Sequence, residues 1–275
     1  MKIGVITSLT ASRRDALFEP VRAFGLRTCQ LSTWSPESLT DELAAKVVEQ
    51  SRAAGVAVAA LWAGLPGPRK WNFTEGPVAL GLVPPQYRSE RVASLKASAG
   101  FARKIGAPAI VTHCGFIPEN MTDPEYPPVV EAVREVAEHC ASLGLEFWFE
   151  TGQETPVVLL RIIQRVGTGN LGINLDPANL LLYGKGSPVD ALHVFGQHVR
   201  NVHVKDGFPP TDGESLGREA QVGRGMVRFP EFVAKLKGLG FDGEWIIERE
   251  IAEGEGKNRD IQETVSNLRE WWAQA

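Results

Sequence analysis

The chain has 275 residues, 43% of them hydrophobic and 23% charged, and a formal net charge of −4. This length allows one large domain or two small ones, and the acidic balance leaves no basic footprint, so we expect no nucleic-acid partner. No apolar run reaches the roughly 18 residues of a membrane span, no leader pattern opens the chain, and three widely separated cysteines suit a reducing compartment, so we expect a cytoplasmic protein with no membrane partner.

From the N-terminus the chain repeats one unit: a short run rich in Val, Ile and Ala, a polar loop, a segment of helical period, and a glycine before the next run. Short runs of this composition predict β-strands. The eight predicted strands cover residues 3–7, 27–31, 56–61, 109–113, 145–150, 171–176, 201–205 and 244–248. The predicted helices include residues 41–54, 88–105, 127–143, 156–166, 229–239 and 260–272.

Local signals mark the ends of the predicted helices. Thr155-Pro156 and Ser187-Pro188 each offer an N-cap followed by proline at the first helical position, where the missing N–H costs nothing. A helix end before a strand needs a left-handed residue. Six glycines fall at such places: Gly25, Gly55, Gly106, Gly144, Gly169 and Gly240.

Eight βα units without a linker or composition shift predict one domain over residues 1–275, a single (β/α)₈ TIM barrel. The main rival is a doubly wound open sheet. A dinucleotide-binding version of that fold needs a glycine fingerprint after the first strand, and residues 8–12 read Ser-Leu-Thr-Ala-Ser instead.

Two predicted loops are long for a barrel, at residues 62–87 and 207–228. Both follow strands at the C-terminal face, where barrels bind their substrates. The first contains aromatic and cationic side chains of the kind that cover a polar ligand: Trp62, Arg69, Lys70, Trp71 and Phe73. A loop that packs its own aromatics explains the same composition.

Four consecutive predicted strands end in a carboxylate or an imidazole, namely Glu150, Asp176, His203 and Glu248. A charge at a buried strand end is costly unless it is paired, and three neighbouring carboxylates repel one another, so a divalent cation would stabilise the group. Three oxygens and one nitrogen favour Mn²⁺, with Co²⁺, Mg²⁺ or Zn²⁺ as alternatives. Any one of these acids alone reads equally well as a helix cap.

Several short motifs, in this order, resemble the xylose isomerase-like TIM barrels, a family that includes ketose 3-epimerases, hydroxypyruvate isomerases, inosose dehydratases and type IV apurinic endonucleases. The resemblance covers essentially the whole chain. Its motifs are Phe149-Glu150-Thr151, Asn174-Leu175-Asp176-Pro177-Ala178-Asn179, Val202-His203-Val204-Lys205-Asp206, Gln221-Val222-Gly223-Arg224-Gly225, and Phe241-Asp242-Gly243 with Glu248 beyond it.

The resemblance implies one divalent metal ion held by Glu150, Asp176, His203 and Glu248. It also implies isomerisation or epimerisation of a sugar or sugar phosphate through a metal-stabilised enediolate. A cation that holds a carbonyl and the neighbouring hydroxyl acidifies the C–H between them. Glu150 and Glu248 lie on strands three steps apart around the ring, so we expect them to act as the acid/base pair.

Five further residues are candidate substrate contacts: Trp62, His113, Asn179, Lys205 and Arg218. The family often has a histidine at the positions of His113 and Asn179. For three of them a second interpretation stays open: His113 as a core histidine, Lys205 as the partner of a strand-end acid, and Arg218 as a solvated loop residue. Asp206 is expected to brace the loop that follows it.

Alternative functions remain beside the isomerase. A dehydratase of the inosose type would use the same metal site with a different general acid. An apurinic endonuclease-like phosphodiesterase is disfavoured, because that branch adds histidines where this chain has Trp62 and Asn179, and in a region where it has none after His203. A non-catalytic sugar-binding or partner-binding protein would not need both glutamates. We expect a sugar or polyol substrate and leave a homo-oligomer open.

Overall fold

The computed structural model describes residues 1–10 and 15–275, and in it eight parallel strands close into a barrel. The strands are β1 (Lys2–Ser8), β2 (Thr28–Thr33), β3 (Ala57–Ala63), β4 (Ala109–Thr112), β5 (Glu146–Glu150), β6 (Leu171–Leu175), β7 (Val199–Val204) and β10 (Glu244–Ile247). They follow chain order around the ring, and β10 pairs with β1 to close it. The predicted (β/α)₈ barrel is confirmed, and the open sheet is wrong.

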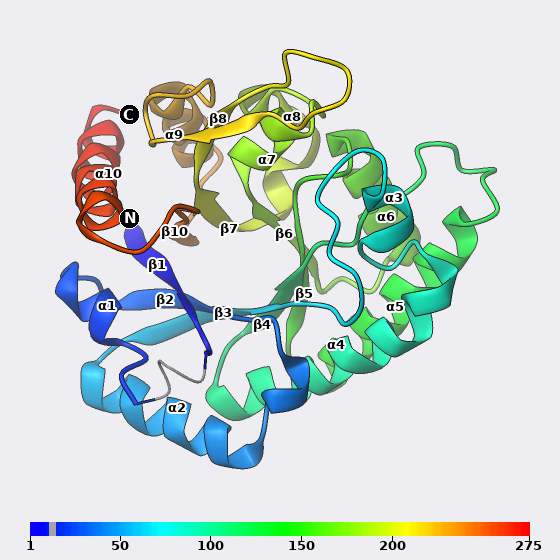
Figure 1. Cartoon of the computed structure of the whole chain (residues 1–275), viewed down its shortest axis with the longest axis horizontal. Helices are drawn as coiled ribbons and strands as arrows, with labels where there is room; N and C mark the ends of the chain where they lie inside the picture. The colour runs from blue at the N-terminus through cyan, green and yellow to red at the C-terminus, as the bar shows by residue number, and fades with distance from the viewer. Residues whose placement is uncertain (11–14) are drawn as a thin grey trace.

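Helices surround the barrel, and the C-terminal helix (red in Figure 1) completes the ring beside the blue N-terminal strand. The helices are α1 (Glu19–Ala23), α2 (Asp41–Ala54), α3 (Gly76–Ala79), α4 (Pro85–Ile105), α5 (Tyr126–Ser142), α6 (Pro156–Val166), α7 (Pro177–Leu182), α8 (Pro188–Phe195), α9 (Phe229–Gly238) and α10 (Glu255–Gln274). Two short 3₁₀ turns occupy Pro36–Ser38 and Gly196–His198. Each long helix buries an apolar stripe against the strands.

The predicted caps are confirmed. The Thr155 hydroxyl accepts from the Val158 N–H and the Ser187 hydroxyl from the Asp190 N–H, each with proline at the start of its helix. The six glycines predicted at helix ends all have positive φ values, between 60° and 81°, but α6 ends at Gly167, two residues before the predicted Gly169. These local signals placed most helix and strand ends within two or three residues of their observed positions.

The prediction of a loop over residues 207–228 was wrong in one respect, because the segment contains a β-hairpin. β8 (Asp206–Phe208) and β9 (Arg218–Ala220) form a two-stranded antiparallel sheet outside the barrel. Each strand has three residues, too few to show a period of two in the sequence. The loop over residues 62–87 likewise contains α3, and its first residues extend β3.

Asp206 fixes the base of this hairpin, as predicted. Its buried carboxylate accepts four backbone N–H groups, at distances of 2.8 to 3.1 Å. The donors are Gly207, Gly223, Gly225 and Val227. A Cβ on Gly225 would lie 2.1 Å from Asp206 Oδ1, so glycine is required at that position.

The cysteines and the helices also agree with the sequence. All three cysteines are free and buried, and burial raises the pKa of the Cys29 thiol to about 12, so the predicted packed thiols are confirmed. Within residues 1–10 and 15–275, no helix combines the length and apolar character that a membrane span requires.

Candidate active site

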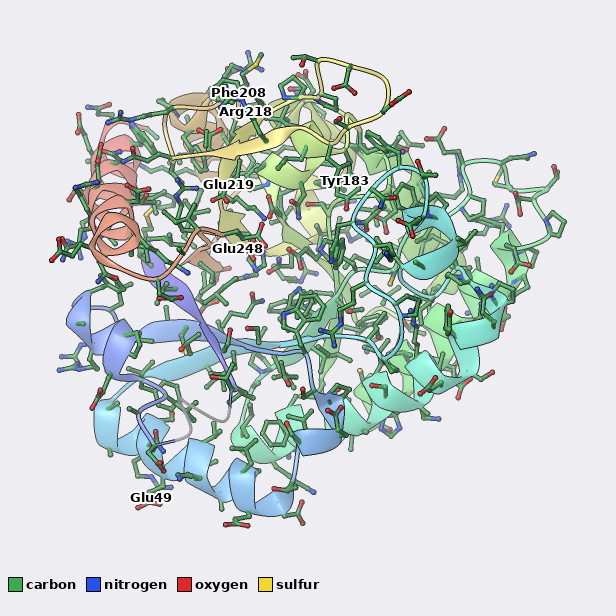
Figure 2. All side chains as sticks on the ribbon, in the orientation of Figure 1. Glu49, Tyr183, Phe208, Arg218, Glu219 and Glu248 are labelled. Carbon is green, nitrogen blue, oxygen red and sulfur yellow. The ribbon has the colours of Figure 1, made fainter. Side chains whose placement is uncertain are left out.

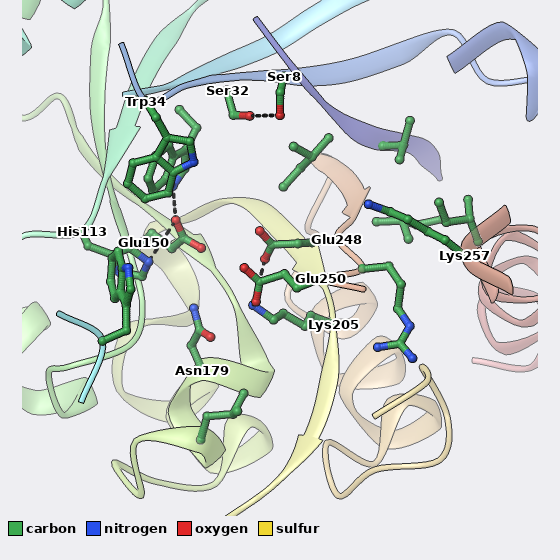
Figure 3. Close-up of a pocket in the computed structure, with 18 of the residues that line it drawn as sticks. Ser8, Ser32, Trp34, His113, Glu150, Asn179, Lys205, Glu248, Glu250 and Lys257 are labelled. Atoms are coloured by element: carbon green, nitrogen blue, oxygen red, sulfur yellow. Dashed lines mark hydrogen bonds and ion pairs between the residues drawn. The ribbon is translucent and has the colours of Figure 1, made fainter. Parts of the chain in front are cut away.

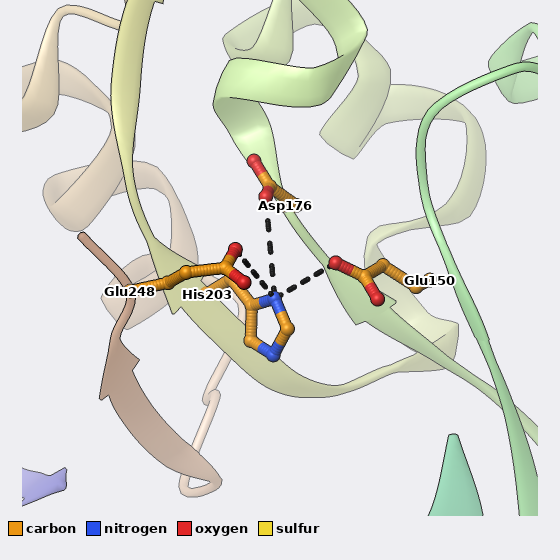
Figure 4. A group of neighbouring side chains, drawn as sticks. All are labelled: Glu150, Asp176, His203 and Glu248. Atoms are coloured by element: carbon orange, nitrogen blue, oxygen red, sulfur yellow. Dashed lines mark hydrogen bonds and ion pairs between the residues drawn. The ribbon is translucent and has the colours of Figure 1, made fainter. Parts of the chain in front are cut away.

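Four side chains from four neighbouring strand ends meet at the C-terminal end of the barrel (Figure 4). One ligand atom from each of Glu150, Asp176, His203 and Glu248 lies within 4.8 Å of all the others. His203 Nδ1 is 3.0 Å from Glu150 Oε1, 3.4 Å from Glu248 Oε2 and 4.0 Å from Asp176 Oδ2. The structure thus brings together all four residues predicted to hold a metal.

The other ring nitrogen of His203, Nε2, contacts the side chain of Gln30 on β2, and this contact fixes the orientation and the protonated nitrogen of the neutral imidazole. The side-chain oxygen of Asn174 accepts hydrogen bonds from the side-chain NH₂ groups of Gln30, at 3.3 Å, and Asn201. Because the Gln30 NH₂ group is used in this way, its side-chain oxygen faces His203 Nε2. Nε2 therefore donates its proton to Gln30, and in the neutral ring Nδ1 turns a lone pair toward three carboxylates. Such a partner behind a histidine is typical of metal ligands.

Asp176 presents one oxygen that no described residue hydrogen-bonds. It is the N-cap of α7, and its Oδ1 accepts from the Asn179 N–H at 2.9 Å. Thr151 fixes its backbone from the other side, since the Thr151 hydroxyl bonds both the N–H and the C=O of Asp176. Oδ2 is fully buried without a hydrogen-bond donor and points into the cluster. The Lys205 ammonium lies 3.7 Å from this oxygen, beyond hydrogen-bond distance, so Oδ2 can still accept a directly bound cation.

The pKa shifts of the cluster also indicate that it attracts positive charge. Burial raises the pKa of Asp176 well above its usual range, although Lys205 opposes the shift. Burial by itself would lower the pKa of His203, but the charges of Glu150 and Glu248 outweigh it and raise that pKa well above normal. The cluster therefore attracts either a proton or a metal cation to the space in front of His203 Nδ1.

The second oxygen of Glu150 is held from the opposite side by aromatic residues. The Trp62 indole N–H donates to Glu150 Oε2, and His113 Nε2 lies 3.3 Å from the same atom. His113 in turn packs edge-on against Trp71, with ring centroids 5.1 Å apart. Trp62 and His113, predicted as substrate contacts, thus touch Glu150 and also line the cavity described below.

Lys205 forms the ion pairs that one of its two interpretations predicted. Its ammonium lies 3.3 Å from Glu248 Oε2 and 3.7 Å from Asp176 Oδ2, and it also contacts Glu250. It lines the cavity as well, so a contact with substrate remains open to it.

Glu150 and Glu248 line a cavity of about 670 Å³, while Asp176 and His203 are fully buried beside them. Figure 3 shows Glu150, His113 and Asn179 on one side of it and Lys257, from the start of α10, on the other. Three tryptophans form one wall, Trp34, Trp62 and Trp71, and the hydroxyls of Ser8 and Ser32, 3.0 Å apart, lie on another. A mixed aromatic and polar lining of this size suits a small polar ligand.

Arg218 is the predicted contact that the structure does not bring to the cavity. It lies exposed on β9, and its guanidinium stacks on the Phe208 ring at 4.3 Å (Figure 2). The solvated-loop interpretation therefore fits it better, and we leave it out of the proposed site.

Two residues that the sequence did not single out contribute to the site. Gln30 orients His203, and the only sequence signal was one amide within the apolar run Cys29-Gln30-Leu31. Trp34 packs edge-on to Trp62, with ring centroids 4.5 Å apart, yet it follows β2 in a stretch without any pattern. Both depend on contacts between distant parts of the chain.

Glu154, in the loop after β5, is a second buried carboxylate beside the site. It is 1% exposed, and neither oxygen has a hydrogen-bond partner among the described residues. Burial raises its pKa to about 8. Glutamate in an unfolded chain has a pKa of about 4.3, so the folded protein binds this proton more tightly than the unfolded chain does. The stabilising contribution is complete at low pH and is lost as pH rises toward 8.

We therefore expect Glu154→Gln to remove part of the decline in stability at alkaline pH. The unfolding free energy of the variant minus that of the wild type is expected to rise with pH between 5 and 8, by up to about 1.4 kcal/mol per unit. Urea unfolding at several pH values measures this difference. Glu138→Gln, exposed on α5, is the control. A difference that stays constant over this pH range would contradict the buried, protonated Glu154.

Comparison with known proteins adds relatives of the whole barrel. The sequence matches the model of the xylose isomerase-like TIM barrel family over residues 18–271. A xylose isomerase domain protein from Planctomyces limnophilus is 34% identical, with 99% of each chain covered and a TM-score of 0.91. The uncharacterized protein MJ1311 of Methanocaldococcus jannaschii is 29% identical over 174 residues, which span only 57% of its length and 58% of this chain.

More distant solved structures share the fold. A D-tagatose 3-epimerase-like protein is 21% identical with a TM-score of 0.74, over 100% of this chain and 99% of that one. A xylose isomerase-like TIM barrel protein from Mycobacterium smegmatis in complex with magnesium is 16% identical with a TM-score of 0.71, over 98% and 97% of the two chains. With the barrel, the four strand-end residues and the match over nearly its whole length, the chain belongs to the xylose isomerase-like TIM barrel family.

Proposed function

We propose that Glu150, Asp176, His203 and Glu248 hold one divalent cation, with Mn²⁺ the first candidate and Mg²⁺, Co²⁺ or Zn²⁺ as alternatives. The observation that carries this proposal is the position of His203 Nδ1, within 4.0 Å of carboxylate oxygens from Glu150, Asp176 and Glu248, while its Nε2 contacts Gln30. The donor set of oxygens with one nitrogen suits such ions. Among the described residues this is the one group of this kind, which favours a single-metal enzyme over a multi-metal phosphodiesterase.

We further propose that the protein isomerises or epimerises a sugar bound in this cavity, through an enediolate intermediate. When bound, the cation would polarise a carbonyl and the neighbouring hydroxyl and so acidify the C–H between them. One glutamate then takes the proton from this carbon, and the C–H electron pair forms the carbon–carbon double bond while the carbonyl oxygen gains negative charge. The other glutamate returns a proton to the opposite face of the same carbon, which restores the carbonyl and gives the epimer. If the proton goes instead to the former carbonyl carbon, the neighbouring hydroxyl passes its proton to the former carbonyl oxygen and becomes the new carbonyl, which gives the isomer.

Glu150 and Glu248 suit these two roles because they reach the cluster from separate sides. β5 and β10 are three steps apart around the barrel, and Figure 4 shows the two carboxylates on opposite sides of the imidazole. Glu150 is oriented by Trp62 and His113, and Glu248 by Lys205. A rigid pair of this kind can remove a proton on one face and deliver it on the other.

The substrate we propose is a small sugar or polyol. The tryptophan wall would pack against the C–H face of a sugar ring, and Asn179, His113 and Lys205 would contact its hydroxyls. The similarity to a 3-epimerase-like protein supports a ketose among the candidates. A dehydratase remains the second possibility within the same site, since Lys205, 3.3 Å from Glu248, is available as a general acid for a departing hydroxyl.

The test combines metal analysis with incubation in deuterated water. We expect the purified protein to bind about one divalent ion per chain, and deuterium to enter a carbon next to the carbonyl of its substrate when ketoses, aldoses and inososes are screened. Loss of a hydroxyl from the product would identify the dehydratase instead. A metal-loaded protein that exchanges no deuterium into any of these compounds would overturn the proposal.

A further inference from the structure

Glu248 lies beyond the last residue of β10, in a segment without regular secondary structure. The strand ends at Ile247, and one backbone bond, from the Glu248 N–H to the Val204 carbonyl at 3.2 Å, continues the pairing with β7. A carboxylate that binds a metal or moves a proton needs a position fixed to a fraction of an ångström. Residues that hold the chain directly after Glu248 therefore affect what Glu248 can do.

The two residues after Glu248 are held by Glu219, which projects from β9 of the hairpin. Glu219 Oε1 accepts from the Arg249 guanidinium at 2.7 Å, and both Glu219 oxygens lie 3.2 Å from the Glu250 N–H. Asp260 of α10 accepts from the other side of the same guanidinium at 2.9 Å. We call Glu219, Arg249, Glu250 and Asp260 the Glu219 bridge.

Three of the four side chains in the Glu219 bridge are sheltered from water, whereas the Glu250 side chain is 60% exposed. The side chains of Glu219, Arg249 and Asp260 are only 14%, 14% and 13% exposed. Charge-assisted hydrogen bonds in such surroundings are stronger and less screened than surface ion pairs. One guanidinium thus joins the hairpin, the end of β10 and the final helix.

A second connection leads from the Glu219 bridge to Glu248. The Glu250 carboxylate contacts the Lys205 ammonium, which lies 3.3 Å from Glu248 Oε2 (Figure 3). Glu219 therefore acts on Glu248 through the backbone of residues 249–250 and through the side chains of Glu250 and Lys205. Figure 2 labels Glu219 between Arg218 on the hairpin and Glu248.

We propose that Glu219 is a positioning residue: through the Glu219 bridge it holds Glu248 in the place where it binds the cation and transfers protons. The inference rests on the proposed metal site. It goes beyond that site by giving the hairpin outside the barrel a part in the chemistry. Residues in this supporting role at metal sites typically cost about 10- to 100-fold in metal affinity or activity when they are removed.

The test compares Glu219→Ala and Glu219→Gln with Glu214→Ala, a control in the exposed tip of the same hairpin. Mn²⁺ titration of metal-free protein is expected to give a Kd about tenfold or more weaker for Glu219→Ala, and an intermediate value for Glu219→Gln, which keeps one acceptor oxygen. Amide hydrogen exchange should speed up at residues 248–250 in the same order. With substrate, kcat should fall while KM changes little. Glu214→Ala should match the wild type throughout.

Unchanged Mn²⁺ affinity in a folded Glu219→Ala protein would overturn the inference, whether or not exchange at residues 248–250 speeds up. If Glu219→Ala does not fold, the Glu219→Gln protein decides in the same way. A wild type that binds Mn²⁺ but acts on no sugar would contradict the proposed function alone, because the Mn²⁺ comparison still tests the role of Glu219. A wild type that binds no divalent ion would overturn both.

Discussion

Glu150→Gln is expected to lower turnover by at least about 10³-fold, an effect as large as that of any substitution we propose. The carboxylate would lose its proton-accepting ability, and general acid–base groups typically contribute about 10²- to 10⁴-fold. It would also lose charge as a cation ligand, so Mn²⁺ affinity should fall as well. The amide can still face Trp62 and His203, which makes unfolding an unconvincing explanation for the loss.

Deuterium exchange and turnover of the most active sugar measure this effect, together with an Mn²⁺ titration. Glu146→Gln is the matched control, because it makes the same change at the opposite end of the same strand, where Glu146 pairs with Arg200 at 3.3 Å. We expect Glu248→Gln to behave like Glu150→Gln. A Glu150→Gln protein that keeps a tenth of wild-type turnover would show that Glu150 does not belong to the acid/base pair.

Asp176→Asn is expected to have opposite effects on stability and on metal binding. In metal-free protein it replaces a buried carboxylate whose Oδ2 has no hydrogen-bond partner, and Lys205, 3.7 Å from that oxygen, keeps Glu248 and Glu250 as partners. The amide carbonyl can still cap α7, since asparagine is as good an N-cap as aspartate. Because burial raises the pKa of Asp176 above its unfolded value, the wild type loses stability as pH rises toward the folded pKa. We therefore expect the metal-free variant to be more stable at pH 8 by about 1 to 3 kcal/mol.

The same variant should lose most of its affinity for the cation, because one charged ligand of four is gone. Thermal unfolding with and without Mn²⁺ measures both effects: added Mn²⁺ should raise the Tm of the wild type and leave that of Asp176→Asn nearly unchanged. Asp190→Asn, in the exposed first turn of α8, is the control. An Asp176→Asn protein whose Tm rises with Mn²⁺ as much as that of the wild type would remove Asp176 from the site.

Much of the fold followed from the sequence because its signals are local. Proline after Thr155 marks the start of one helix, and glycine at position 55 marks the end of another, each through contacts with residues nearby in the chain. Repetition of the βα unit then predicts the barrel. The hairpin of β8 and β9 did not follow, because strands of three residues are too short to show a period, and the Asp206 carboxylate that fixes the hairpin base bonds residues up to 21 positions away.

The four strand-end residues were predictable because barrel topology brings the carboxyl ends of all strands to one face. What surrounds them was not predictable in the same way. Gln30 and His203 are 173 residues apart, and Glu219 reaches Arg249 across 30 residues from a strand that the sequence did not reveal. Such partnerships depend on register and side-chain direction, which neither composition nor periodicity encodes.

The four N–H groups that converge on Asp206 have a consequence for how this barrel can change. They fix the base of the hairpin from within, and Glu219 fixes its return strand. The exposed tip over residues 211–215 takes no part in either set of bonds, while Leu216 just after it lines the cavity. Tips of other lengths and sequences can therefore be exchanged by evolution or by protein engineers. This would alter what the cavity accepts while leaving the four strand-end residues in place.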